Sequence, residues 1–158
     1  MSDAAEPDRA GWGERTAAAL IDLTIAATIL IAAIVAGSIL IAAGGEAGGE
    51  WIALGIVLIV GGTLAAVLYA PVMMVRSGEA NGVTIGKRAA DLRVLRNNGK
   101  PIGFWLAVLR EFVLPIVIGI LITGGLFWLV DVLWPLFDKE DRAIHDIVCE
   151  THVVNVGR

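Results

Sequence analysis

The sequence is short of cysteine, of charged residues and of basic residues. Cys149 is the only cysteine among 158 residues, so no disulfide can form within the chain, and a disulfide-stapled secreted domain is excluded. Twelve Lys and Arg against 16 Asp and Glu give a net charge of -4, which is the wrong sign for a surface that binds nucleic acid. Charged side chains make up only 18% of the chain, whereas an average soluble domain has about 25%. The chain therefore has little surface suited to water.

Two long apolar runs stand out against this background. Hydrophobic residues make up 57% of the chain, and they concentrate in residues 17–43, where Asp22 is the only ionisable side chain, and in residues 51–75, which carry no charge. A helix of about 20 apolar residues crosses the bilayer core and satisfies its own backbone hydrogen bonds there. Each run therefore predicts a transmembrane helix, with the lipid bilayer as its partner. Residues 44–50, GGEAGGE, predict a flexible turn on the extracellular side.

The basic residues are unevenly distributed along the chain. Residues 76–103 contain six of the twelve Lys and Arg residues, and short loops rich in these residues stay on the cytoplasmic side. We therefore expect this loop and the amino-terminal segment, residues 1–14, to be cytoplasmic. The sequence predicts a single domain over residues 1–158, a multi-pass protein of the cytoplasmic (inner) membrane that ends in a tail over residues 138–158.

The third apolar region, residues 104–137, allows two topologies. It can cross once with tilt, or its break at Thr123, Gly124 and Gly125 can turn the chain into a helical hairpin that returns to its starting side. As a helix this region would measure about 51 Å, which is short of two full passes of about 30 Å each. The length therefore slightly favours a single crossing, and a hairpin would have to be re-entrant or lie in thinned bilayer.

Two short segments have the composition of β-strands. Residues 91–102, DLRVLRNNGKPI, alternate apolar and basic side chains before a turn, and residues 151–156, THVVNV, are rich in β-branched residues. A small sheet joining them requires both on the same face of the membrane, so we expect the hairpin and an internal carboxyl terminus. The predicted fold class is all-α membrane: a small helical bundle with two clear transmembrane helices, a third apolar region forming a broken helix or helical hairpin, and a small cytoplasmic β element.

Asp22 is the first candidate for a functional residue. A carboxylate inside the bilayer costs about 2.5–3.5 kcal/mol on insertion scales unless water or a partner meets it. Arg15 lies on the same helix face, but about 10 Å nearer the cytoplasm, so water or a third group must fill the gap between them. The alternatives are an ion-binding pair, or an interfacial arginine together with a structural hydrogen bond between helices.

Further charged residues are candidates for the same site. Asp131 and Arg110 lie in the third apolar region, where Arg110 or its neighbour Glu111 could be the missing partner of an intramembrane carboxylate. Their alternative role is to mark an interface or a helix break. Asp146, beside His145, could handle protons, or it could cap backbone donors and pair with an arginine.

The segment GVTIGKR, residues 82–88, does not match a phosphate-binding loop. Its glycines are one residue too close, and Arg88 stands where a Ser or Thr would bind magnesium. We expect Thr84 to cap a short helix, and Lys87 and Arg88 to lie near anionic lipid headgroups. The sequence has no metal-ligand cluster, activated nucleophile or cofactor fingerprint, so we predict neither an enzyme, nor a cofactor, nor a bound metal.

The order of these motifs resembles the RDD family of membrane proteins. The matching segments are ERTAAALID with Arg15 and Asp22, GVTIGKRAADLRVL, VLRE with Arg110, and Asp138 followed by IHDIVCETHVV. The resemblance covers the chain from Gly11 to Val154. It implies that the arginine and the two aspartates of the family name are Arg15, Asp22 and Asp146.

The chain departs from the family pattern at two positions. Ile85 stands where Pro is frequent, and Glu150 stands where Gly often precedes the Thr, so both changes affect turn geometry more than charge. The resemblance implies a bacterial membrane protein of a family that is mostly uncharacterised. Transport is suspected for the family, and cation/proton exchange has been proposed for some members.

Two functional hypotheses are compatible with these residues. The leading one is a small transporter or cation/proton exchanger, in which Asp22 alternately binds a proton or a monovalent cation. Because the bundle is thin, we expect a homo-oligomer, with small-residue pairs such as Gly61–Ala65 and Gly62–Ala66 at close helix contacts. The alternative is a non-transporting scaffold or accessory subunit that docks a partner or anionic lipid through its basic loop, with Arg15 and Asp22 as a fold latch.

Overall fold

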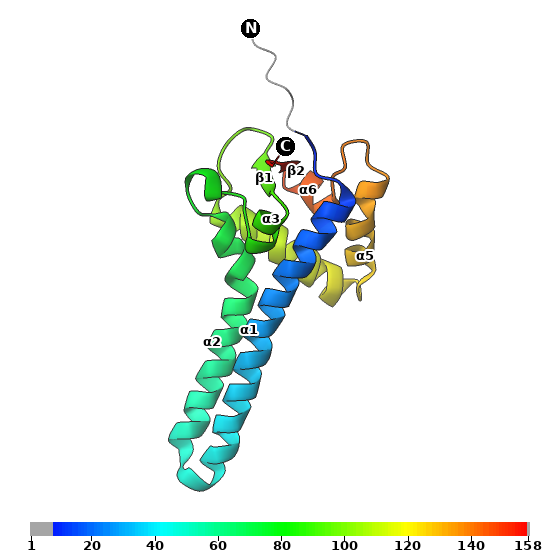
Figure 1. Ribbon diagram of the computed structural model, residues 1–158. Coiled ribbons are helices and arrows are strands. Elements are labelled where there is room, and N and C mark those ends of the chain that lie inside the picture. Colours follow the sequence, from blue (N-terminus) through cyan, green and yellow to red (C-terminus); the bar gives the residue numbers. More distant parts are fainter. Residues whose placement is uncertain (1–7, 158) are drawn as a thin grey trace. The chain divides into compact units, whose positions relative to one another are not determined.

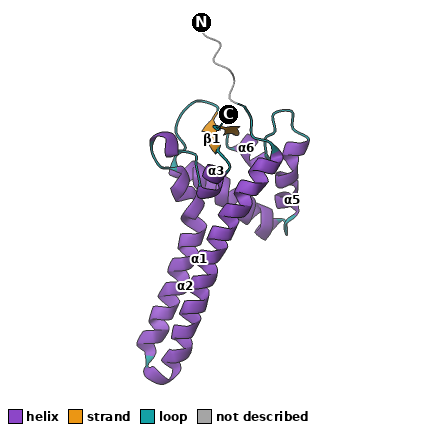
Figure 2. Ribbon diagram, viewed as in Figure 1, coloured by secondary structure: helices purple, strands orange, loops and turns teal. Residues whose placement is uncertain are grey.

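Helices form most of the chain. The computed structural model describes residues 8–157, apart from the side chains of residues 46 and 47 (Figure 1). The elements in order are α1 (Trp12–Ala47), α2 (Gly49–Met74), η1 (Gly78–Ala80), α3 (Ile85–Ala89), β1 (Leu92–Arg96), α4 (Phe104–Val108), η2 (Leu109–Ile122), α5 (Leu126–Leu133), η3 (Trp134–Leu136), α6 (Ile144–Val148) and β2 (Thr151–Asn155). Figure 2 shows the predominance of helix and the small β element. The predicted fold class is confirmed.

The chain divides into two compact units. The first, Leu23–Tyr69, is called the helix pair below; the second, called the sheet unit, combines residues 8–22 with residues 70–157. The predicted amino-terminal segment, residues 1–14, lies partly outside the described residues, which begin at residue 8. Each unit is described by itself.

In the helix pair, α1 and α2 run antiparallel with almost no loop between them. Only Gly48, with a φ of 111°, separates the two helices, so the predicted flexible turn over residues 44–50 is wrong. Helix α1 continues because the Gly48 N–H donates to the carbonyl oxygen of Gly44 at 3.1 Å. Gly44 also lets α2 approach closely, since a Cβ there would lie 2.7 Å from Cγ1 of Ile52.

Small residues bring the two helices of the pair into close contact. A Cβ on Gly55 would lie 2.5 Å from the carbonyl oxygen of Gly37, and a Cβ on Gly62 would lie 2.1 Å from Cβ of Ala33. The predicted close packing at Gly62 is therefore confirmed within the helix pair. Its neighbour Gly61 has open space around it.

Large apolar side chains of the helix pair face outward. Val57 and Ile39, for example, are 66% and 63% exposed. Three helices, Trp12–Gly45, Gly49–Met74 and Phe104–Ile122, are long and apolar enough to cross a membrane. Exposed apolar surface of this kind is stable in lipid and unfavourable in water. The chain is a membrane protein.

The third apolar region forms a helical hairpin in the sheet unit, as predicted. Helix α4 continues into η2, a π-helix, and the chain then turns through Gly124 and Gly125, whose φ angles of 62° and 94° favour glycine. Helix α5 packs back against η2. Gly119 permits this approach, because a Cβ there would lie 3.1 Å from Cβ of Trp128.

The β element joins three distant parts of the chain. Strands β1 and β2 pair antiparallel, with Val94 opposite Val153. The N–H of Ala10 donates to the carbonyl oxygen of Val153 at 3.1 Å, which adds the segment before α1 to the same sheet. The basic loop, the tail and the start of α1 therefore lie together, and the hairpin brings the tail back beside the basic loop.

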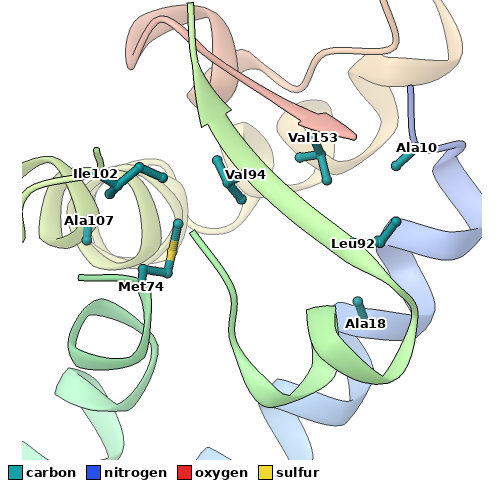
Figure 3. Close-up of a cluster of buried hydrophobic side chains, with 8 residues drawn as sticks. All are labelled: Ala10, Ala18, Met74, Leu92, Val94, Ile102, Ala107 and Val153. Carbon is teal, nitrogen blue, oxygen red and sulfur yellow. The ribbon is translucent and has the colours of Figure 1, made fainter. Parts of the chain in front are cut away.

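A small apolar core holds the sheet unit together (Figure 3). It consists of the buried side chains of Ala10, Ala18, Met74, Leu92, Val94, Ile102, Ala107 and Val153. Gly82, with a φ of 78°, fits its backbone directly against β1, since a Cβ there would lie 2.1 Å from the carbonyl oxygen of Val94. This core connects α1, the end of α2, both strands and α4.

Replacing Gly62 by Ala is expected to destabilise the helix pair, because the new methyl group would overlap Ala33 and overpacking costs about 1–3 kcal/mol. The matched control is Gly61→Ala, which makes the same change one residue earlier, in open space. The control should keep or slightly raise stability, since alanine favours helix over glycine. Thermal unfolding of both purified variants in one detergent measures the difference, and equal midpoints would contradict the close contact at Gly62.

Candidate functional site

Asp146 lies at the centre of a buried ion cluster in the sheet unit. Its side chain is fully buried, its Oδ2 accepts from Nη1 of Arg15 at 2.9 Å, and its Oδ1 accepts from Nη2 of Arg110 at 2.6 Å. The Thr151 hydroxyl and the Ala143 N–H each donate to the same carboxylate at 3.2 Å. One side chain of α6 therefore connects α1, η2 and the start of β2.

The surrounding positive charges keep Asp146 ionised. Burial alone would raise the pKa of this carboxyl, but the charges of Arg110, His145 and Arg15 outweigh that effect and hold the pKa below its ordinary value of 3.8. The pKa of Asp146 is lower in the folded protein than in the unfolded chain, so the ionised carboxylate stabilises the fold at pH values above 3.8. That stabilisation is lost as the pH falls from 3.8 toward the lowered value.

Arg15 has further hydrogen bonds that fix it at the start of α1. Its Nε donates to the carbonyl oxygen of Ala10 at 2.9 Å, and its Nη2 donates to that of Val153 at 3.4 Å. The side chain of Arg15 is 13% exposed. Arg15 thus ties the amino-terminal segment, β2 and Asp146 together.

Glu111 extends the cluster to α3. Its carboxylate pairs with Nη1 of Arg110 and accepts from Nζ of Lys87 at 3.2 Å. The Lys87 side chain is only 13% exposed and therefore lies against the protein, whereas its neighbour Arg88 is exposed. Of the two residues predicted to lie near lipid headgroups, only Arg88 has an exposed side chain.

Asp22 binds the start of α3. Its Oδ2 accepts from the Thr84 hydroxyl at 2.5 Å, and its Oδ1 accepts from the Gly86 N–H at 2.8 Å. Gly86 leaves no room for a side chain, because a Cβ there would lie 2.1 Å from the carbonyl oxygen of Ala18. Thr84 also accepts from the N–H of Lys87 at 3.2 Å, so the predicted helix cap is confirmed.

Asp131 connects the hairpin to α6. It is 2% exposed, and its two oxygens contact His145: Oδ1 accepts from the backbone N–H at 2.8 Å, and Oδ2 lies 2.6 Å from Nδ1 of the ring. On the other side of the ring, Nε2 lies 3.7 Å from Oδ1 of Asp146. His145 therefore lies between two buried carboxylates.

The structure brings four of the five predicted site residues into one cluster, whereas the fifth, Asp22, binds other residues. Arg15 and Arg110 each pair with the Asp146 carboxylate, and Asp131 reaches this carboxylate through His145. Asp22 binds Thr84 and Gly86 instead. The Thr84 hydroxyl and the Gly86 N–H are two of the partners that a carboxylate at this position was expected to need.

Sequence reasoning misses two residues that complete these contacts. Gly86 gives α1 its close approach to α3, and Thr151 donates to Asp146 while its hydroxyl lies 3.4 Å from Nε of Arg110. Neither residue is unusual for its local secondary structure. Both lie in segments that carry the family resemblance, GVTIGKR and CETHVV, and that resemblance is the only signal in the sequence that points to them.

The described residues include no group of three or more His, Cys, Asp or Glu side chains that could hold a metal ion. Cys149 lies beside the cluster in sequence and is buried. Burial raises the pKa of its thiol to about 11, although the charge of Arg110 acts in the opposite direction. The thiol is therefore protonated at neutral pH and is not an activated nucleophile.

These features define a class of protein: a small membrane protein with an apolar helix pair, a helical hairpin and a buried arginine–aspartate cluster. The model of the RDD family matches residues 9–150. The chain belongs to the RDD family, which confirms the resemblance seen in the sequence. No curated protein and no solved structure matches the chain.

The departure from the family pattern at Glu150 lies at a strained position. Glu150 has a φ of 51°, in the left-handed region that glycine adopts with little cost and other residues adopt rarely. Its carbonyl oxygen accepts from the N–H of Asn97 at 2.9 Å, which closes the sheet next to Thr151. The contacts of the sheet therefore hold Glu150 in a conformation that its side chain disfavours.

Replacing Asp146 by Asn is expected to destabilise the protein by about 3–5 kcal/mol, because two arginines would lose the charge that compensates them. Glu140→Gln is the matched control, since Glu140 pairs with Arg9 on the surface, where both side chains are more than one third exposed. The control should change stability little, because exposed ion pairs contribute little. Denaturant unfolding in detergent compares the two variants, and a similar small loss in both would contradict a central role for Asp146.

Proposed function

We propose that the protein is a non-transporting membrane scaffold or accessory subunit, rather than an enzyme or a transporter, that docks a partner or anionic lipid through its basic loop, residues 76–103. The observation that carries this proposal is the internal pairing of the cluster. Asp146 binds two arginines, a hydroxyl and a backbone N–H, and Glu111 binds Arg110 and Lys87. Groups paired in this way stabilise a fold and leave little capacity for a transported ion.

The role of Asp22 in this proposal is that of a latch. Its carboxylate holds the Thr84 hydroxyl and the Gly86 N–H against α1, at a position where Gly86 permits backbone contact with Ala18. The latch therefore fixes one end of the loop that carries the basic residues. A loop fixed in this way presents a defined surface to a partner, because less conformational entropy is lost on binding.

We also propose that this surface faces the cytoplasm. The basic loop, the tail and the segment before α1 share one sheet, so they lie on one side of the bilayer. Six of the twelve Lys and Arg residues lie in that loop, and the positive-inside rule assigns such a loop to the cytoplasm. The same argument supports the inner membrane and an internal amino terminus.

The second candidate is a cation/proton exchanger. The observation that favours it is the position of Asp22, the only ionisable side chain from residue 17 to residue 43, where its carboxylate accepts from the Thr84 hydroxyl and the Gly86 N–H. Ionisable side chains within membrane-spanning segments often mark ion or proton pathways. This candidate would place the pathway in a homo-oligomer, for which the exposed Gly61–Ala65 pair offers a contact.

Proteoliposomes with an imposed pH gradient distinguish the two candidates. We expect no cation-dependent proton flux from the wild type, and the same result for Asp22→Asn, which removes the titration but keeps an acceptor oxygen for Gly86. A monovalent-cation ionophore added at the end of each trace is the positive control. Flux in the wild type that is lost in Asp22→Asn, at equal thermal stability, would overturn the scaffold proposal in favour of the exchanger.

Cysteine labelling in sealed cells tests the sidedness. In a Cys149→Ser background, Val156→Cys in the tail should react with a membrane-impermeant maleimide only after permeabilisation, because Val156 follows β2 on the side of the basic loop. The matched control is Gly45→Cys, near the connection between α1 and α2, which should be labelled in intact cells. The reverse pattern would overturn the cytoplasmic assignment.

A further inference from the structure

A pocket of about 330 Å³ lies beside the sheet, away from the buried ion cluster. It is formed by β1, the turn after β1, the residues near η1, and His152 of β2. Its size is at the small end of the range for ligand sites. The family pattern of Arg15, Asp22 and Asp146 contributes none of the residues that line it.

The charged side chains that line the pocket are all basic. Arg93, Arg96 and Lys100 contribute to its wall together with His152, whose pKa is lowered by burial, and none of the described residues in that wall is acidic. Elsewhere in the sheet unit, Arg15, Lys87 and Arg110 are each paired with a carboxylate. Side chains of one charge gathered in a recess repel one another, and an anion bound among them would remove that repulsion.

Hydrogen bonds preorganise one wall of the pocket. Arg93 donates from Nε to the carbonyl oxygen of Asn81 at 2.9 Å and from Nη2 to that of Gly78 at 3.0 Å. The Asn81 side chain is itself buried and binds the backbone of Met74 and Ile102. The guanidinium of Arg93 is therefore held in a fixed plane, and its Nη1 has no hydrogen bond to the described residues.

Arg96 contributes a second guanidinium to the wall of the pocket, and its side chain is partly buried. Its Nε is buried and has no hydrogen-bond partner among the described residues. A buried guanidinium N–H without an acceptor is costly, and native proteins seldom leave one in that state. Phosphate oxygens are good acceptors for arginine, because they match its planar arrangement of donors and carry the opposite charge.

We propose that this pocket binds a phosphate group, with Arg93, Arg96 and Lys100 as its ligands. The group belongs either to a soluble phosphorylated molecule or to an anionic lipid headgroup. This inference rests on the proposed docking function, since it names the residues of the basic loop that bind and the chemistry that they recognise. The Asn97–Gly99 turn, which brings Lys100 to the pocket with Gly99 at a φ of 69°, completes the site.

Calorimetric titration of the full chain in a zwitterionic detergent tests the site with two probes. Inorganic pyrophosphate represents the soluble source, and short-chain phosphatidic acid represents the lipid source, with short-chain phosphatidylcholine as the uncharged comparison. The double variant Arg96→Gln/Lys100→Gln should bind the effective probe about tenfold more weakly or worse, as expected when charge-assisted hydrogen bonds are lost. The matched control is Arg88→Gln, an exposed arginine outside the pocket, which should change the affinity less than about twofold.

Each outcome has a defined meaning. Binding of pyrophosphate supports a soluble ligand, and binding of phosphatidic acid alone supports a lipid headgroup. Absence of binding for both probes overturns the inference, and so does an equal loss of affinity in Arg88→Gln, which would indicate nonspecific attraction to net charge. If the double variant does not fold, Lys100→Gln alone changes an exposed side chain and should still weaken binding about threefold or more.

The inference and the proposed function fail in different measurements. If neither probe binds and the proteoliposomes show no proton flux, the phosphate site is rejected and the scaffold proposal stands. Proton flux that depends on Asp22, together with phosphate binding that depends on Arg96, would remove the scaffold proposal and leave the phosphate site.

Discussion

The burial of one carboxylate between two arginines organises the sheet unit. Asp146 is fully buried, and it meets Arg15 of α1 and Arg110 of η2 within hydrogen-bond distance. Taking three charged groups out of water is favourable only when their geometry satisfies all of them. The positions of α1, η2 and α6 in this unit are therefore interdependent: moving one of them would leave a buried charge without its partner.

Other carboxylates repeat this arrangement on a smaller scale. Asp22 joins α1 to α3, Glu111 joins α3 to η2, and Asp131 joins α5 to α6. Each links two separate helical elements, and each is bonded to a donor inside the protein. In a chain with few charged residues, these acidic side chains add hydrogen bonds and ion pairs between helices to the apolar packing.

The sequence allowed much of the fold to be predicted, because membrane-spanning helices have a strong local signal. Length and apolarity identified α1 and α2, and Thr123-Gly124-Gly125 identified the turn of the hairpin, where two glycines adopt positive φ angles. The connection between α1 and α2 was predicted incorrectly. Its glycines suggested flexibility, but they instead permit close helix contact, as at Gly44 against Ile52.

The sequence by itself determined the solvent of the protein, the positions of its long apolar segments and the charged residues that lie within them. These properties depend on the local composition of segments of about 20 residues, and that composition is the same whichever residues contact one another in the fold. Only the tertiary structure decided which charges meet. Arg15 and Asp146 are separated by 131 residues along the chain, and a pairing over that distance depends on the hairpin and the sheet that bring both ends of the chain together.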